Sequence, residues 1–320
     1  MPKIPHVTQR SDQIVDIGGW TVGDDQSIFP VGSKPKRLVL CPQDAPFPFL
    51  IGGHRYLFKV ASGWREQQLW SEVIAYELAK LCGFWVPPCF AAYDSQKGQS
   101  GVLMEFFYGY PDDPDPLRFV HGADILQRLD KDYHSQTGRP HSISQNIILS
   151  RTLGVPNARD WWARTTAFDA LIGNTDRHAE NWGVMRTVAR APHLPWKLAV
   201  PFDHGTSLGY EVAEDDLGRR SDAASIKGHL SKGRHHCTWL PSTDRKGQAM
   251  FELCAEQCAP FERLKAVMDQ VIPQHDEIIE RAVSQWVDFD LPVKFSPARA
   301  KFVMGIIRAR RDELSSRLGL

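Results

Sequence analysis

The sequence IGNTDRHAEN at residues 172–181, together with PFDHG at residues 201–205, decides how the rest of the chain is interpreted. The first stretch places Asp176 five positions before Asn181, and the second supplies another carboxylate, Asp203. Both stretches adjoin apolar residues that are typical of buried strands. The chain therefore carries two carboxylates and an amide in a fixed order, set between otherwise apolar segments.

This set of side chains suits phosphoryl transfer. Such a reaction needs a carboxylate that orients the attacking hydroxyl and accepts its proton, and hard oxygen ligands that hold magnesium on the phosphates. Asp176 suits the first role, and Asn181 and Asp203 suit the second. The spacing equals the D-x-x-x-x-N step of protein-kinase catalytic loops, and Asp203-His204-Gly205 stands where those enzymes have Asp-Phe-Gly. Separately, Asp176 and Asn181 are more often turn-formers, but together they predict an ATP-dependent kinase with magnesium.

A lysine and a glutamate upstream fit the same interpretation. Residues 55–60 alternate as a strand that contains Lys59, and residues 66–82 have helical periodicity that ends at Gly83. Kinases pair a strand lysine, which holds the phosphates, with a glutamate of the next helix. Glu72 is the first candidate and Glu77 the second, although a solvated helix face is the commoner role for either glutamate alone.

Two further segments complete the predicted nucleotide site. Gly32, Ser33, Lys34 and Lys36 lie in a turn whose amides and ammonium groups could cover phosphates, although an ordinary hairpin turn is the alternative. Residues 102–107 read as a strand. We expect the backbone from Glu105 to Phe107 to face the adenine as a hinge, with the lobe boundary between 1–108 and 109–320.

The second half of the chain has mainly helical patterns. Asn157 is an N-cap candidate for the clearest helix, whose Trp161 and Trp162 we expect to pack in the core. His178 could touch the transferring phosphate or brace the loop. The candidate helices lie at residues 122–133, 143–153, 157–172, 250–269, 276–286 and 297–318.

Residues 206–248 are rich in Gly, Ser and charge and have little periodicity. This segment occupies the position of a kinase activation segment, and a solvated surface insert is the equally weighted alternative. As an activation segment it would offer three candidate phosphorylation sites, Ser221, Ser225 and Ser231. Near the end of the last helix, Arg308, Arg310 and Arg311 suggest helix-dipole and solubility roles rather than a nucleic-acid patch.

Composition limits the partners. The 320 residues contain 38 basic and 38 acidic side chains, so nothing predicts a general attraction to nucleic acid or to a membrane. No signal-peptide core or membrane-spanning run is evident, which predicts a cytoplasmic protein. The six cysteines do not suggest a disulfide framework, and a zinc site built from residues 235–237 with Cys254 and Cys258 matches no common module.

The stretch at residues 171–181 resembles the catalytic loop of HipA-like serine/threonine kinases, and the turn around Gly32 resembles their phosphate loop. This resemblance implies a two-lobed α+β fold with a small β-rich N-lobe and a larger helical C-lobe. It also implies a protein Ser/Thr hydroxyl as acceptor and makes Ser33 a candidate for autophosphorylation. Full-length HipA toxins carry an additional N-terminal subdomain that we do not expect in this shorter chain. That difference weighs against toxin activity and leaves room for a separate small, antitoxin-like partner.

Two other functions are compatible with the motifs. Asp176-Arg177-His178 also resembles the loop of phosphoinositide 3-kinases, so the acceptor could be an inositol lipid or a small molecule. No basic membrane-binding cluster supports a lipid. A nucleotide-binding pseudokinase scaffold is the other alternative, but a scaffold would not need all three oxygen-bearing side chains.

Overall fold

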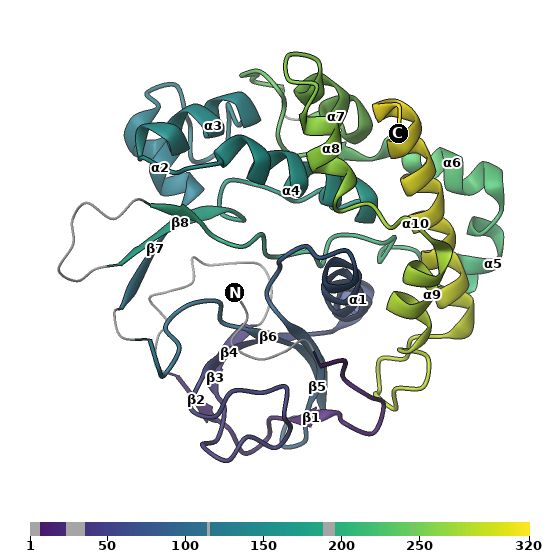
Figure 1. Cartoon of the computed structure of the whole chain (residues 1–320). Helices are drawn as coiled ribbons and strands as arrows, with labels where there is room; N and C mark the ends of the chain where they lie inside the picture. Colours follow the sequence, from purple (N-terminus) through teal and green to yellow (C-terminus); the bar gives the residue numbers. More distant parts are fainter. Residues whose placement is uncertain (1–6, 24–35, 114–115, 188–195, 245) are drawn as a thin grey trace.

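The computed structural model describes residues 7–23, 36–113, 116–187, 196–244 and 246–320. A six-stranded sheet occupies the N-terminal part of the chain, and the remainder is mostly helical (Figure 1). The predicted α+β arrangement, with a small β-rich lobe and a larger helical lobe, is confirmed. Among the described residues, no helix combines the length and apolar character needed to cross a membrane.

The N-terminal sheet has the order β1-β5-β6-β4-β3-β2. Strand β1 runs parallel to β5, and the other pairs are antiparallel. The strands are β1 (Val15–Asp16), β2 (Thr21–Val22), β3 (Lys36–Leu40), β4 (Arg55–Val60), β5 (Cys89–Asp94) and β6 (Gln99–Glu105). Strand β4 is central, so Tyr56, Leu57 and Phe58 are all buried instead of alternating as the sequence suggested.

Helix α1 (Gln68–Leu81) follows the short helix η1 (Gly63–Arg65) and lies between the sheet and the helical lobe (Figure 1). All its residues from 68 to 79 are buried because β5 and β6 cover one side and α9 (Asp276–Ser284) another. Trp70 contacts the rings of Trp286 and Phe295, with centroids 6.2 and 5.6 Å away. The main hydrophobic core thus runs across the proposed boundary at residues 108/109.

The helical lobe is built around α4 (Ala158–Ile172). Its Trp162 is fully buried beside Trp182, as expected for core packing. Asn157 stands at the N-cap, as predicted, but it has φ +56° and makes no side-chain capping bond. The other elements that precede residue 200 are β7 (Leu117–His121), α2 (Gly122–Leu129), α3 (Ile143–Thr152), β8 (Gly183–Thr187) and β9 (Lys197–Leu198).

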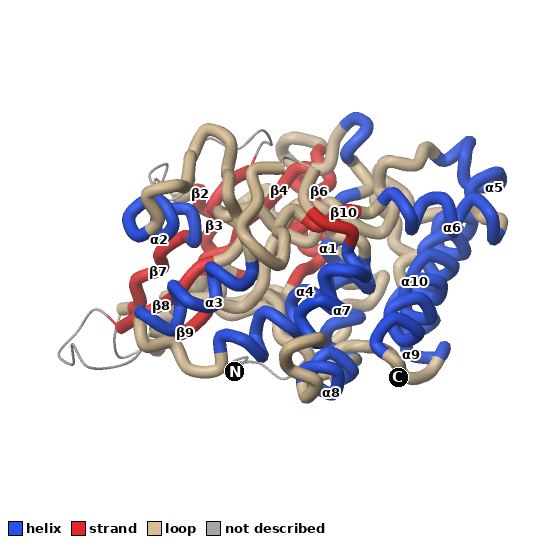
Figure 2. The backbone as a smooth tube through the Cα atoms, turned by 90° about the horizontal axis from the view of Figure 1, so that it is seen from above, coloured by secondary structure: helices blue, strands red, loops and turns tan. Residues whose placement is uncertain are grey.

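The segment at residues 206–248 is more regular than the sequence suggested. It contains η2 (Glu214–Asp216), α5 (Leu217–Arg220), α6 (Ala223–Lys232) and β10 (Arg234–His235), and β10 pairs with β11 (Gln248–Ala249). Leu217, Ile226 and Leu230 are buried, and α5 and α6 contact α10 (Pro297–Leu318). Figure 2 shows α6 and α9 alongside α10. The segment is therefore a folded layer and not a solvated insert.

Two expectations for the C-terminal helices need correction. The single helix predicted at residues 250–269 is divided into α7 (Met250–Cys258) and α8 (Leu264–Asp269), because Pro260 cannot continue the helical hydrogen bonds. Arg310 is not a solubility residue: it is buried, and its guanidinium donates to the Ala170 carbonyl at 2.9 Å. Burial lowers the pKa of Arg310 to about 10, so it remains charged at the C-terminal end of α4.

Gly173 is the residue through which α4 enters the following loop, and its φ of +72° favours glycine. A Cβ there would lie 2.7 Å from Arg310 Cζ. We expect Gly173→Ala to lower the free energy of unfolding by more than the ~1–2 kcal/mol of the left-handed conformation alone. Gly154, which follows α3 with φ +75° and open space around it, supplies the matched control Gly154→Ala. Urea denaturation of both variants measures the difference, and equal losses would contradict the predicted clash.

Candidate active site

Lys59 on β4 connects the two lobes through ion pairs. Its ammonium lies 2.7 Å from Glu72 Oε1 on α1 and 2.9 Å from Asp203 Oδ1. Burial alone would lower the pKa of Lys59, but the carboxylates of Asp203 and Glu72 outweigh burial and raise it. Glu77, the alternative partner, instead pairs with Lys80 at 2.6 Å. The structure thus brings together Lys59, Glu72 and Asp203, which are far apart in sequence.

The segment that begins at Asp203 is held against α1. Glu72 Oε2 accepts the His204 backbone N–H at 3.0 Å, and the Ser71 hydroxyl donates to the Ser207 carbonyl at 2.9 Å. Asp203 itself has φ +61°, a conformation uncommon outside glycine that the surrounding bonds maintain. Burial and the Arg177 charge lower the pKa of His204 to about 3, so this imidazole is neutral.

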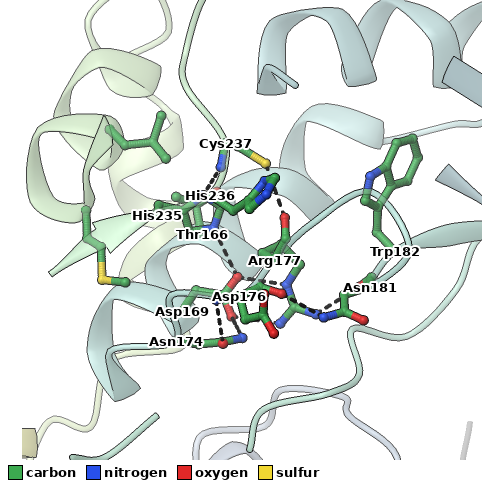
Figure 3. Close-up of polar contacts among 12 residues, drawn as sticks. Thr166, Asp169, Asn174, Asp176, Arg177, Asn181, Trp182, His235, His236 and Cys237 are labelled. Atoms are coloured by element: carbon green, nitrogen blue, oxygen red, sulfur yellow. Dashed lines mark hydrogen bonds and ion pairs between the residues drawn. The ribbon is translucent and has the colours of Figure 1, made fainter. Parts of the chain in front are cut away.

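A fully buried ion pair organises the loop after α4 (Figure 3). Arg177 Nε and Nη2 donate to the two carboxylate oxygens of Asp169 at 2.9 and 2.7 Å. The other terminal nitrogen, Nη1, donates to the carbonyls of Asn181, at 2.9 Å, and Phe202. Burial alone would raise the pKa of Asp169, but Arg177 and His235 outweigh it and lower that pKa. One guanidinium therefore ties α4 to both motif-bearing loops.

Asn174 joins the same two loops from the other side. Its side-chain oxygen accepts the Asp176 N–H at 3.2 Å and the Thr206 hydroxyl at 2.9 Å. Its amide nitrogen donates to Asp169 Oδ1 at 2.9 Å. The position of Asp176, the candidate base, is therefore set in part by Asn174, which the D-x-x-x-x-N spacing does not include.

Asn181 and Asp203 provide an oxygen donor set that fits magnesium. The Asn181 amide nitrogen donates to the Asp176 carbonyl at 2.6 Å. The side-chain oxygen of Asn181 has no partner among the described residues, so it is the atom that could bind a ligand. The Asp203 side chain is 32% exposed, so its carboxylate is accessible to a ligand. An amide oxygen and a carboxylate are the hard ligands that Mg²⁺ prefers, and Mg²⁺ usually retains several waters besides.

His178 is partly buried and is braced locally. Its Nδ1 accepts the Glu180 N–H at 3.2 Å, so the proton of the neutral ring is on Nε2. The ring lies edge-to-face with His236, at a centroid distance of 6.1 Å. The bracing role through Nδ1 is therefore compatible with donation from Nε2–H.

Part of the predicted phosphate loop falls outside the described residues, namely Gly32, Ser33 and Lys34. Lys36 begins β3 and is paired in register with Lys59. Directly paired residues project from the same face of a sheet, so the two lysines are neighbours on that face.

The predicted hinge is only partly available to a ligand. The N–H of Glu105 donates to the Pro88 carbonyl at 2.8 Å, and the N–H of Phe106 donates to the Arg55 carbonyl at 3.1 Å. Pro88 has no N–H to donate in return, so the Glu105 carbonyl receives no ladder bond from it. Within the described chain the Phe107 backbone makes no hydrogen bond. The free pair is therefore the Glu105 carbonyl and the Phe107 N–H, not the continuous backbone expected.

Sequence reasoning missed several residues that build this site. Asp169 was not singled out, nor was its role as the common partner of Asn174 and Arg177. A carboxylate on the apolar face of α4 was the available signal, because a buried acid needs a partner. His235 was considered only for zinc, yet its Nε2 lies 3.2 Å from Asp169 Oδ2.

The comparisons with known proteins agree with this architecture. The model of the HipA-like C-terminal domain family matches residues 31–286. No curated protein matches the sequence. The fold is similar to that of the Helicobacter pylori proinflammatory kinase CtkA, with a TM-score of 0.72, 13% identity, and coverage of 95% of this chain and 96% of that one. It is also similar to Shewanella oneidensis HipA, solved with HipB and operator DNA, with a TM-score of 0.54, 14% identity, and coverage of 92% and 68%.

We expect Asp169→Asn to be strongly destabilising, because it leaves the Arg177 charge buried without its carboxylate. Removing one partner of a buried pair typically costs about 3–5 kcal/mol. Asp160, on the same helix, pairs with Arg263 at the surface and provides the control Asp160→Asn, expected to cost under about 1 kcal/mol. Chemical denaturation of the two variants tests this contrast, and similar losses would show that the buried pair has no special role.

Glu105 generates a pH-dependent prediction. Burial raises its pKa to about 7, from an ordinary value of 4.5, and its Oε1 accepts the Tyr110 hydroxyl at 2.7 Å. The folded state therefore retains a proton that the unfolded state loses, and this residue's contribution to stability falls as the pH rises from about 4.5 to 7.

Glu105→Gln keeps an acceptor for Tyr110 but cannot ionise. Its free energy of unfolding should therefore rise relative to wild type over that pH range, by on the order of 3 kcal/mol. Exposed Glu256→Gln is the control, expected to stay within about 0.5 kcal/mol of wild type. Denaturation at a series of pH values gives both curves. A pH-independent gap for Glu105→Gln would refute the prediction.

Proposed function

Because the chain belongs to the HipA-like C-terminal domain family, we propose that it is an ATP-dependent protein kinase that phosphorylates serine or threonine. The observation that carries the proposal is the ion-pair set of Lys59 with Glu72 and Asp203, directly beside a loop that presents Asp176 and Asn181. This combination supplies a phosphate contact, a base and two oxygen ligands in one place.

In this mechanism Lys59 binds phosphate oxygens of ATP while Glu72 keeps its ammonium in place. Asn181 and Asp203 would hold Mg²⁺, which neutralises phosphate charge when bound. Asp176 accepts the proton of the attacking hydroxyl, and the buried Asp169–Arg177 pair keeps its loop in position. Preorganised groups of this kind reduce the reorganisation that the reaction requires.

The hinge geometry supports adenine binding. The Glu105 carbonyl and the Phe107 N–H give one acceptor and one donor two residues apart on the same edge. We assign residues 1–108 and 109–320 to the two lobes on either side of this edge. The covering loop with Gly32, Ser33, Lys34 and Lys36, and autophosphorylation of Ser33, remain part of the proposal.

A small protein partner is also part of the proposal. Shewanella HipA was solved with HipB and DNA, and a similar fold makes an antitoxin-like protein a reasonable partner to test. The balanced charge of this chain does not favour direct nucleic-acid binding, and a cytoplasmic location stays an expectation from composition.

Intact-mass analysis after incubation with ATP and magnesium tests the activity. We expect wild type to gain phosphate and both Asp176→Ala and Asp203→Ala to gain none. Removal of a general base typically costs 10²–10⁴-fold, and Asp203→Ala removes a proposed magnesium ligand. Exposed Asp12→Ala is the matched control and should behave as wild type.

If wild type gains nothing, magnesium-dependent ATP binding decides the question. Binding that disappears in Asp203→Ala would indicate an enzyme that requires its own protein substrate. Absence of nucleotide binding in wild type would overturn the proposed function.

A further inference from the structure

Residues His235, His236 and Cys237 attach the folded segment after Asp203 to the catalytic loop (Figure 3). The Cys237 backbone N–H donates to His235 Nδ1 at 3.0 Å, so the proton of His235 is on Nε2, which donates to Asp169 Oδ2. The Cys237 thiol donates to the Arg177 carbonyl at 3.7 Å. The flanking residues thus hold His236 in a fixed place beside the loop.

A chain of hydrogen bonds determines which nitrogen of His236 carries the proton. The indole N–H of Trp182 lies 3.1 Å from His141 Nε2, and an indole can only donate. His141 Nε2 is therefore unprotonated, and the proton of this buried, neutral ring is on Nδ1. His141 Nδ1 lies 3.2 Å from His236 Nδ1 and donates to it. His236 Nδ1 is consequently an acceptor, and its own proton must be on Nε2.

The environment of His236 keeps the ring neutral and partly open. Burial and the Arg139 charge lower the pKa of His236 to about 3. Gly138 lies beside the outer edge of the ring, where a Cβ would be 3.8 Å from His236 Cε1. The ring of His178, two residues after Asp176, lies edge-to-face with the His236 ring. No partner for His236 Nε2 is present among the described residues.

Two imidazoles, those of His178 and His236, therefore lie side by side with Nε2–H donors, and His178 is two residues after the candidate base. Neutral N–H groups in a partly desolvated site need an acceptor, and the strongest acceptor that a kinase brings to this position is the transferring phosphoryl group. A neutral donor contributes there without forming an ion pair with the Asp176 carboxylate, whose proposed role is to accept a proton.

Building on the proposed kinase function, we propose that His236 is a nucleotide-binding residue whose Nε2–H donates to a γ-phosphoryl oxygen of ATP. The tautomer that makes this possible is set at a distance by Trp182 through His141. A contact with γ-phosphate alone predicts discrimination between nucleoside triphosphate and diphosphate.

Two substitutions separate the functions of the two ring nitrogens. The side-chain amide of asparagine lies near the position of the histidine Nδ1. In His236→Asn the amide oxygen can therefore still accept from His141 Nδ1, but the Nε2–H donor is lost. Gln places its amide nitrogen near the position of Nε2, so His236→Gln retains that donor. Isothermal titration calorimetry with magnesium compares two probes, ADP and the imido analogue of ATP.

We expect His236→Asn to bind the imido analogue about tenfold more weakly than wild type, with ADP affinity unchanged. His236→Gln should stay within about threefold of wild type for both nucleotides. Unchanged binding of the imido analogue in His236→Asn, or equal losses for both nucleotides, would overturn the inference. If wild type binds neither nucleotide, the proposed kinase function fails instead.

A second measurement uses wild type alone and does not depend on how the variants fold. Nitrogen-15 NMR of the histidine rings should show His236 protonated on Nε2, and this signal should shift when the imido analogue is added but not when ADP is added. A His236 ring protonated on Nδ1, or identical shifts with both nucleotides, would contradict the assignment.

Discussion

The Asp169–Arg177 ion pair is the interaction on which the rest of the site depends. Both side chains are fully buried, and buried ion pairs contribute little net stability because desolvation offsets their attraction. Their effect here is geometric. The carboxylate accepts from two nitrogens of the guanidinium, and the third nitrogen donates to the backbone carbonyls of Asn181 and of Phe202, which precedes Asp203. A neutral side chain in place of either partner could not position both loops with one planar group.

The surrounding contacts extend this fixed geometry outward. Asn174 connects the loop of Asp176 to Thr206, and Glu72 connects the segment at Asp203–His204 to α1. Residues 235–237 add a third layer from the folded segment that precedes α7. The candidate active site is therefore assembled from helices α1 and α4 and from loops whose hydrogen bonds are mutually dependent.

The sequence predicted the fold class and most helices. It also singled out candidate residues that the structure brings together, such as Lys59, Glu72 and Asp203, because D-x-x-x-x-N and the lysine-glutamate order are local patterns with a chemical reason. It could not predict which residues hold those groups, because Asp169, Asn174 and His141 meet their partners only after folding. Arg310 was misassigned for the same reason: a run of arginines near a helix end looks exposed until the packing of α10 on α4 is known. The helical content of residues 206–248 was missed because it depends on burial against α10 and not on a strong period.

Pro88 has a consequence for which base the site would accept. Any other residue there could donate its N–H to the Glu105 carbonyl and close the strand ladder at that point. With proline, the edge offers an acceptor followed by the Phe107 donor. Adenine presents an amino donor beside a ring-nitrogen acceptor, whereas guanine presents a carbonyl at the equivalent position. In the proposed kinase, the absence of a single proton on the backbone would thus favour ATP over GTP, and selectivity for the nucleotide would originate in a residue that does not touch it.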